Sequence, residues 1–218
     1  MFTLDPDSSV FVVDDDRGAR DTVTALIRIM GLQTKAFPTA ETFLAENAHH
    51  QPGCVIADLR MPGLSGIGML KTMRRDGSQM PLILVTAYAD VPLAVEALHE
   101  GALTILEKPY RQQVLWDFMV LALRSDYDQR SKAAARVSLL NRIRELSHEE
   151  TCVLQMMVND VPNKVIASRL QISLRTVDHR RMEILEKLQM ENLKSLIWHL
   201  GAAGWPMGQD HADAMVPV

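Results

Sequence analysis

CVIAD, residues 54–58 of this 218-residue chain, is an apolar run with the length of a buried β-strand, and it ends in a carboxylate. Similar apolar runs recur on both sides of it, at residues 10–13, 34–37, 82–85 and 104–106. A stretch with helical periodicity follows each of the five runs in turn, at residues 17–30, 40–46, 66–75, 91–99 and 112–124. Strands that alternate with helices of this length predict a parallel sheet with right-handed crossovers and helices on both faces.

The first half of the chain thus has the pattern of an α/β domain with a five-stranded parallel sheet. Five successive strand–helix units suit the doubly wound, flavodoxin-like order, in which sites lie at the carboxyl ends of the strands. We expect this domain to span residues 1–124. Residues 125–145 are polar, contain alanine and lack Gly and Pro, which predicts a helical linker.

After the linker the pattern is that of an all-α domain. Residues 146–204 predict four short helices, which we expect to form a domain of their own. Ser147 and Glu150 make a capping box for the first helix. The caps expected for the other three helices are Asn163, Ser173 and Asn192. We expect residues 205–218 to be a flexible tail.

Composition restricts the class of protein. With 23 basic and 27 acidic side chains the formal net charge is −4, which argues against a histone-like polybasic nucleic-acid binder. The N-terminus carries acids where a secretory signal carries bases, and no apolar run approaches the ~18 residues of a membrane span. We therefore expect a cytoplasmic protein with no membrane association. Cys54 and Cys152 match no metal-binding spacing, and we expect both thiols to be buried.

Polar and ionisable side chains follow the ends of the expected strands. Asp14 and Asp15 come directly after the first strand, and Asp58 ends the third. Thr86 ends the fourth strand region, and Lys108 follows the fifth. These ends converge on one crevice, where crowded carboxylates need a cation or the lysine to neutralise them. An all-oxygen cluster without His or Cys suits Mg²⁺.

This set of residues resembles a known family. The matching elements, in chain order, are Asp14 with Asp15, DLRMPGLSG at residues 58–66, VTAYAD at residues 85–90 and EKPY at residues 107–110. Together they resemble the receiver domain of bacterial two-component response regulators, over residues 8–124. The resemblance implies that Asp58 is the nucleophile that accepts a phosphoryl group from the phosphohistidine of a sensor histidine kinase.

The resemblance also implies how the phosphoryl group is held. Asp14, Asp15, Asp58 and the backbone carbonyl of Arg60 would bind Mg²⁺, which neutralises the phosphoryl oxygens. Asp16 is either a further ligand or the cap of the first helix, and we favour the cap. The residues that would contact the phosphoryl group or transmit its arrival are Thr86, Ala87, Lys108 and Ile105.

Ile105 is a departure from the family pattern. Receivers usually carry an aromatic residue three positions before the lysine, and rotation of its ring reports phosphorylation. Isoleucine lacks the hydroxyl and the length for that movement. Either Ile105 packs in the core and the helix after Thr86 responds by another route, or coupling to phosphorylation is weak or altered.

Residues 146–188 resemble the LuxR/NarL output domain and, with this linker and receiver, the FixJ subfamily most of all. The specific part is PNKVIASRLQIS at residues 162–173, followed by RTV at residues 175–177. The resemblance implies that residues 146–204 form a helix-turn-helix DNA-binding domain. The third helix of such a domain would read the major groove through its N-terminal residues. The candidate DNA contacts are Lys164, Arg175, Thr176, Asp178, His179, Arg180, Arg181, Met182 and Lys187.

The resemblance implies a transcriptional regulator and not an enzyme, although the receiver would assist its own phosphorylation and dephosphorylation. Phosphorylation would favour a homodimer formed through the receiver face of residues 91–99 and 112–123, and the dimer would bind a two-fold, double-stranded DNA operator. Transcription would change through operator occupancy and contact with RNA polymerase. FixJ-like relatives are mostly activators, which favours activation.

Other classes share parts of this pattern. A phosphatase of the haloacid dehalogenase type needs a second acid two residues after its nucleophile, where this chain has Arg60. A sigma-factor-like domain that binds core polymerase is disfavoured by the linked receiver and by residues 162–173. A receiver-linked transcription factor controlled without phosphorylation is the remaining alternative.

Overall fold

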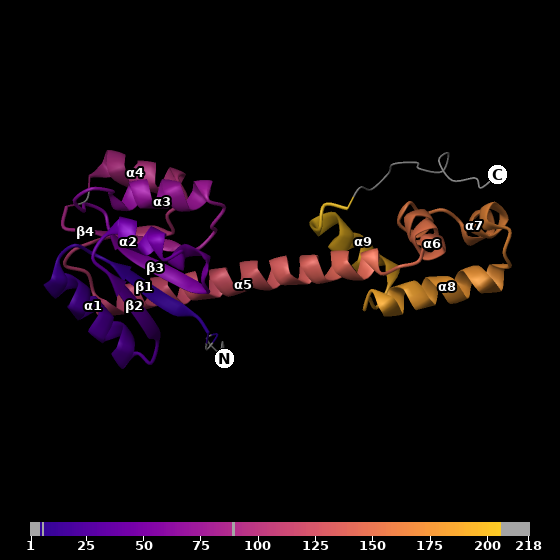
Figure 1. The fold of residues 1–218 in the computed structure, drawn as a ribbon, viewed down its shortest axis with the longest axis horizontal. Coiled ribbons are helices and arrows are strands. Elements are labelled where there is room, and N and C mark those ends of the chain that lie inside the picture. The colour runs from indigo at the N-terminus through magenta and orange to yellow at the C-terminus, as the bar shows by residue number, and fades with distance from the viewer. Residues whose placement is uncertain (1–4, 6, 89, 206–218) are drawn as a thin grey trace. The chain divides into compact units, whose positions relative to one another are not determined.

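The computed structural model describes residues 5, 7–88 and 90–205 of the chain (Figure 1). The chain divides by its internal contacts into two compact units, residues 1–130 and residues 131–218. Helix α5 (Gln112–Arg144) begins in the first unit and ends in the second. The helical linker is therefore a continuation of the last helix of the first unit.

The first unit is built on a five-stranded parallel sheet with the strand order β2-β1-β3-β4-β5. The strands are β1 (Ser9–Val13), β2 (Gln33–Phe37), β3 (Gly53–Asp58), β4 (Leu82–Thr86) and β5 (Thr104–Glu107). Val13 pairs with Ala57, and Asp58 pairs with Val85, so the carboxyl ends of β1, β3 and β4 are level with one another. This arrangement confirms the doubly wound, flavodoxin-like fold.

Helices cover both faces of the sheet (Figure 1). Besides α5 they are α1 (Arg17–Ile29), α2 (Ala40–Ala45), α3 (Gly66–Arg75) and α4 (Val91–His99). Successive strand residues point to opposite faces, so Phe11 and Val13 pack with α2 and α3, while Val10 and Val12 pack with α1 and α5. The two faces thus bury two separate apolar clusters, and the sheet between them is covered on both sides.

Some boundaries differ from those that the sequence predicts. Several strands are longer than their apolar runs, because the ladder continues into Ser9 at the start of β1 and Asp58 at the end of β3. A 3₁₀ turn, η1 (Ala48–His50), precedes β3, and no periodic signal in the sequence predicted it.

The two thiols also differ from each other. Cys54 is fully buried in β3, and burial raises the pKa of its thiol. Cys152 is only half-buried, with its Sγ atom 3.9 Å from Nε2 of His148 one helical turn earlier. The expectation that both thiols are buried was therefore wrong for Cys152.

The middle of α5 is tied to the amino end of β3. The buried carboxylate of Asp126 accepts a hydrogen bond of 2.8 Å from the backbone N–H of Gly53. Arg130 donates through Nε to both oxygens of Asp126, and its Nη2 atom donates to the backbone carbonyls of His50 and Gln51. Burial raises the pKa of Asp126, although Gly53 and Arg130 oppose this change. A Cβ at Gly53 would overlap the carbonyl oxygen of Ser9, so glycine is required at this close approach.

The second unit packs four helices and the last part of α5 around one core. The helices are α6 (His148–Val158), α7 (Asn163–Leu170), α8 (Leu174–Lys187) and α9 (Leu193–Ala202). Leu139 and Ile143 of α5 join a buried cluster with residues of α6, α8 and α9. A smaller cluster of Ile166, Ala167 and Val177 joins α7 to α8, as in a helix-turn-helix.

The helix caps are mostly those that the sequence predicts. The capping box of Ser147 and Glu150 is present, and Ser173 and Asn192 each accept a hydrogen bond from the backbone of their own helix. The prediction that Asn163 caps α7 was wrong, because Pro162 holds the cap position and the Asn163 side chain is bonded to α8.

The end of the chain is only partly described. Trp205, expected to begin a flexible tail, packs against the core of the second unit. Residues 206–218 of the expected tail lie outside the described residues. Within the described part of the chain, every helix is too short or too polar to cross a membrane.

Candidate functional site

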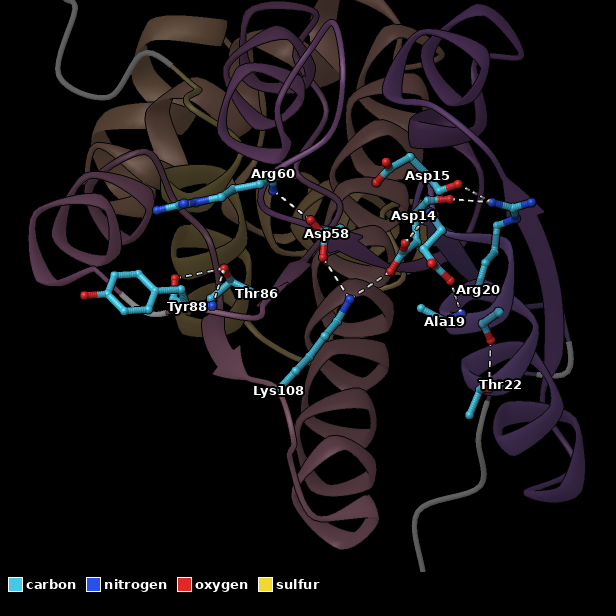
Figure 2. Close-up of polar contacts among 12 residues, drawn as sticks. Asp14, Asp15, Ala19, Arg20, Thr22, Asp58, Arg60, Thr86, Tyr88 and Lys108 are labelled. Atoms are coloured by element: carbon cyan, nitrogen blue, oxygen red, sulfur yellow. Dashed lines mark hydrogen bonds and ion pairs between the residues drawn. The ribbon is translucent and has the colours of Figure 1, made fainter.

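Two carboxylates and a lysine meet at the carboxyl edge of the sheet. Asp14 follows β1, Asp58 ends β3, and Lys108 follows β5. Figure 2 shows the ammonium group of Lys108 between the two carboxylates, 2.8 Å from Oδ1 of Asp58 and 3.0 Å from Oδ2 of Asp14. Residues far apart in the sequence meet here because the carboxyl ends of parallel strands share one edge.

The remaining carboxylate oxygens are held by backbone N–H groups. Asp14 Oδ1 accepts a hydrogen bond of 2.9 Å from the amide of Asp16, and Asp58 Oδ2 accepts one of 2.8 Å from the amide of Arg60. Only 4% of Asp14 and 9% of Asp58 is exposed to solvent. The two acids are thus nearly buried, oriented by the backbone and hydrogen-bonded to the same ammonium group.

The protonation of Lys108 is set by two opposed effects. Partial burial favours the neutral amine, while the hydrogen bonds and charges of Asp58 and Asp14 favour the ammonium. The carboxylates prevail and raise the pKa of Lys108 above its usual value. Lys108 therefore carries its positive charge in this pocket at neutral pH.

The predicted metal ligands do not all converge. Asp15 is exposed, and in the part of the chain that the structure describes, no three His, Cys, Asp or Glu side chains lie close enough to hold a metal ion together. Lys108 already lies between Asp14 and Asp58. Asp16 caps α1, since its Oδ1 atom accepts a hydrogen bond of 2.7 Å from the amide of Ala19, as we favoured from the sequence.

Thr86 is turned toward the loop that follows it. Its side chain, 1% exposed as a residue, donates through Oγ1 to the carbonyl of Tyr88 at 3.0 Å and accepts from the Tyr88 amide at 3.3 Å. Ala87 between them is exposed. The guanidinium carbon of Arg60 lies 5.8 Å from the centre of the Tyr88 ring, at the side of the pocket (Figure 2). Ile105 is half-buried against the apolar cluster under α3 and α4.

In the second unit, the predicted DNA contacts fall into two groups. Arg175, His179 and Met182 are exposed along one ridge of α8, and Lys164 is exposed near the start of α7. The exposed His179 ring also lies 3.3 Å, at Nε2, from a carboxylate oxygen of Glu183 one turn along α8. Met182 has 67% of its surface exposed, so its side chain is open to solvent on this ridge.

The other predicted contacts are engaged within the domain. Arg180 Nη2 lies 2.6 Å from a carboxylate oxygen of Glu149, and Lys187 is paired with Glu150. Asp178 and Arg181 both bond the side chain of Asn163. The Thr176 hydroxyl bonds that of the cap residue Ser173. The Lys187 ammonium lowers the pKa of Glu150, and that carboxylate raises the pKa of Lys187.

Sequence reasoning missed Glu149 and Asn163 as partners of α8. The pairs join residues 15 to 31 positions apart, so no helical spacing relates them. The capping box at Ser147 was the available signal, because it places acids in the first turn of α6.

Comparisons with known proteins agree with both units. Residues 10–119 match the response regulator receiver domain, and residues 144–200 match the bacterial regulatory proteins of the luxR family. The transcriptional regulatory protein FixJ of Bradyrhizobium diazoefficiens is 35% identical over 188 residues, which are 86% of this chain and 92% of FixJ. The response regulator protein TodT of Pseudomonas putida is 32% identical over 190 residues, 87% of this chain and 84% of TodT.

Two solved structures cover both units. The response regulator StyR matches with a TM-score of 0.77 and 33% identity, over 89% of this chain and 98% of StyR. Full-length FixJ from B. japonicum matches with a TM-score of 0.56 and 34% identity, over 91% of this chain and 98% of FixJ.

The chain therefore belongs to the response regulator family, with a receiver domain followed by a LuxR-type DNA-binding domain. Within that family it is of the FixJ/NarL type, a transcriptional regulator that depends on phosphorylation. A histidine kinase and DNA are the partners that these two domains imply.

Proposed function

We propose that Asp58 is the phosphoryl acceptor. The observation that carries this proposal is the Asp58 side chain, nearly buried at the end of β3 with Lys108 on one oxygen and the Arg60 amide near the other. A carboxylate oxygen of Asp58 attacks phosphorus, and the bond from phosphorus to the kinase imidazole breaks as the new bond forms. The imidazole leaves with the electron pair of the broken bond.

Lys108 stabilises the transferred group. Its ammonium lies 2.8 Å from the attacked side chain and keeps its proton, so it can hold a phosphoryl oxygen with a charge-assisted hydrogen bond. The ammonium also holds one carboxylate oxygen of Asp58 in place beside the attacked phosphorus. The receiver in this way assists its own phosphorylation and, with water as the acceptor, its own dephosphorylation.

A magnesium ion fits the chemistry of this pocket. Its donors are all oxygens, and Asp14 and Asp58 face one another across a single cation. Asp14, Asp58 and the carbonyl of Arg60 would hold the ion, and Asp15 would join them by turning its exposed side chain into the pocket. When bound, Mg²⁺ would neutralise charge on the phosphoryl oxygens.

Phosphorylation would act through the loop after β4 and a homodimer. Thr86 would release the backbone of Tyr88 and turn its hydroxyl to the phosphoryl group. The neighbouring helix α4 exposes three large apolar side chains, Val91, Val95 and Leu98. Side chains of this kind gain by burial, so this face suits contact with a second copy of the chain.

The dimer would regulate transcription by binding a two-fold DNA operator. We assign Lys164 and Arg175 to phosphate contacts, and His179 and Met182 to base edges in the major groove. Thr176, Asp178, Arg180, Arg181 and Lys187 would act mainly by holding α8 in place. Occupancy of the operator and contact with RNA polymerase, both in the cytoplasm, would activate the regulated genes.

The experiment that tests the phosphoryl acceptor is intact mass spectrometry after incubation with acetyl phosphate and Mg²⁺. We expect one adduct of about 80 Da, the mass of a single phosphoryl group on a nucleophile, and its loss in Asp58→Ala. Asp21→Ala, an exposed acid on α1, is the matched control that keeps the adduct. An unmodified wild-type chain, also with a phosphorylated kinase as donor, would contradict the proposal.

A further inference from the structure

One amide side chain joins the two helices of the helix-turn-helix. The Nδ2 atom of Asn163, the first residue of α7, donates to Oδ1 of Asp178 on α8 at 2.7 Å. The Oδ1 atom of the same amide accepts from Nη1 of Arg181, also at 2.7 Å. The Asn163 side chain thus forms hydrogen bonds with both Asp178 and Arg181, which lie nearly one turn apart on α8.

These bonds decide which side chains of α8 are available to DNA. Asp178 is exposed as a residue, yet its carboxylate is bonded to α7. A free carboxylate beside the groove would repel phosphates and would accept hydrogen bonds only from base amino groups. With Asp178 and Arg181 bonded to Asn163, the exposed ridge of Arg175, His179 and Met182 is left to face the DNA.

We propose that Asn163 is a positioning residue for base recognition, which holds Asp178 away from the groove and sets the rotation of α8 against α7. The proposal rests on the DNA-binding function proposed above. It makes Asp178 a support of the reading helix, where the sequence pattern alone suggested a direct DNA contact.

The chemistry of the pair allows an exchange experiment. In Asn163→Asp, the new carboxylate still accepts from Arg181 but repels the carboxylate of Asp178. An acid at the first position of a helix is favourable to that helix, so α7 itself is not expected to unfold. In the double variant Asn163→Asp with Asp178→Asn, the new amide at position 178 donates to the new carboxylate at position 163. The double variant also has the net charge of the wild type.

The measurement uses the full-length chain and an operator selected by the wild type from a pool of random duplexes. Dissociation constants are determined for this operator and for a scrambled duplex at one salt concentration. We expect Asn163→Asp to lose about tenfold in the ratio of the two constants, the order that one charge-assisted hydrogen bond supplies. The double variant is expected to regain the wild-type ratio, and Asp178→Asn alone to keep it, because its amide oxygen still accepts from Asn163.

Two controls separate this role from charge and from folding. Gln171→Glu adds the same negative charge at an exposed position between α7 and α8 and is expected to keep the ratio. The melting temperature of each variant and its phosphorylation by acetyl phosphate report whether both domains are folded.

A folded Asn163→Asp variant with the wild-type ratio would overturn the proposal, as would a double variant that fails to recover. A changed base preference in Asp178→Asn would also overturn it, because Asp178 would then contact DNA. A wild type that selects no operator would overturn the DNA-binding function and this inference together.

Discussion

At the scale of single residues, the charge balance of the phosphorylation pocket depends on Lys108. Its ammonium is bonded to both nearly buried acids, Asp14 and Asp58, and the described structure provides no other cation bonded to either carboxylate. Two carboxylates so close to one group repel each other when that group is neutral or absent. A divalent cation attracted to the same acids has to work against the ammonium charge.

We predict that Lys108→Met binds Mg²⁺ more tightly than the wild type but accepts phosphate at least about 100-fold more slowly, the usual cost of losing one preorganised donor. Titration calorimetry gives the affinity, and the rate of the mass increase with acetyl phosphate gives the second quantity. Lys71→Met, which removes a lysine paired with Glu96 at the surface, is expected to change neither. Weaker Mg²⁺ binding in Lys108→Met would contradict this description of the pocket.

His49 is a second residue whose charge depends on its surroundings. Its ring is buried beside Phe43 and His50, and neither ring nitrogen has a hydrogen-bond partner among the described residues. Burial and the neighbouring His50 lower its pKa below the usual 6.5, and Asp76, 3.8 Å from Nε2, opposes them. The unfolded chain therefore binds a proton at His49 at a higher pH than the folded chain does.

We predict from this difference that His49 makes the receiver less stable in acid. The contribution is fully present above pH 6.5 and is lost as the pH falls toward the folded pKa, at a slope of up to about 1.4 kcal/mol per pH unit. The measurement is urea unfolding of the wild type and of His49→Gln from about pH 7.5 to about pH 5, a range that covers this titration. The variant should show the flatter profile, and His99→Gln, an exposed histidine on α4, should match the wild type.

At the scale of elements, α8 is held by side chains of α6 and α7, and its ridge of Arg175, His179 and Met182 is exposed. Glu149 and Glu150 of α6 pair with Arg180 and Lys187, while α7 provides Asn163. Ion pairs at the surface add little to the free energy of unfolding. The main effect of these pairs is to determine which basic side chains are available to DNA phosphates. Within the described part of the chain, Lys164 and Arg175 are the predicted DNA-contacting cations that form no ion pair.

We predict that Lys164→Ala and Arg175→Ala each reduce the salt dependence of DNA binding by about 0.9 in the log–log slope, the value for one phosphate contact. Arg180→Ala and Lys187→Ala should leave the slope nearly unchanged, because both bases are neutralised within the domain. Fluorescence anisotropy on an operator between about 50 and 200 mM salt measures the four slopes. Equal changes in all four variants would mean that the pairs with Glu149 and Glu150 open on DNA.

The ridge of α8 has a separate prediction. His179→Ala and Met182→Ala are expected to relax sequence preference, with a loss of about 1 kcal/mol or more on the operator and little loss on random DNA. The same anisotropy assay with both duplexes measures this difference. Equal losses on the two duplexes would show that these residues do not read bases.

At the scale of the whole molecule, the structural effect of phosphorylation at Asp58 has to be transmitted to the proposed dimer surface on α4. Thr86 is hydrogen-bonded to the backbone of Tyr88, three residues before α4 begins at Val91, whereas Ile105 is half-buried among apolar side chains. This arrangement favours the route through Thr86 over one through position 105. A tenfold change in operator affinity needs only about 1.4 kcal/mol of coupling.

We predict that acetyl phosphate drives dimerisation of the wild type and of Ile105→Phe to the same extent. Thr86→Val should gain the phosphoryl adduct at Asp58 and still fail to dimerise, because it has no hydroxyl to exchange between Tyr88 and the phosphoryl group. Sedimentation velocity with and without acetyl phosphate measures the dimer. Altered dimerisation of Ile105→Phe would instead assign the coupling to position 105.

The sequence by itself determined the parallel sheet, the helix-turn-helix and the pocket of Asp14, Asp58 and Lys108. These features follow from local rules: periodicity sets the elements, and strand ends in a doubly wound sheet converge. Caps such as Ser173 were predictable for the same reason, since their bonds reach only three residues along the chain.

Only the tertiary structure decided which charged side chains are paired with each other. The Asp126–Gly53 bond and the Asn163 bridge join residues from separate elements, and no spacing in the sequence encodes them. For Lys108 the sequence predicted the pocket, and the tertiary structure decided that its ammonium is hydrogen-bonded to both acids. Such contacts depend on how elements that are distant in the sequence pack together, so local sequence patterns do not predict them.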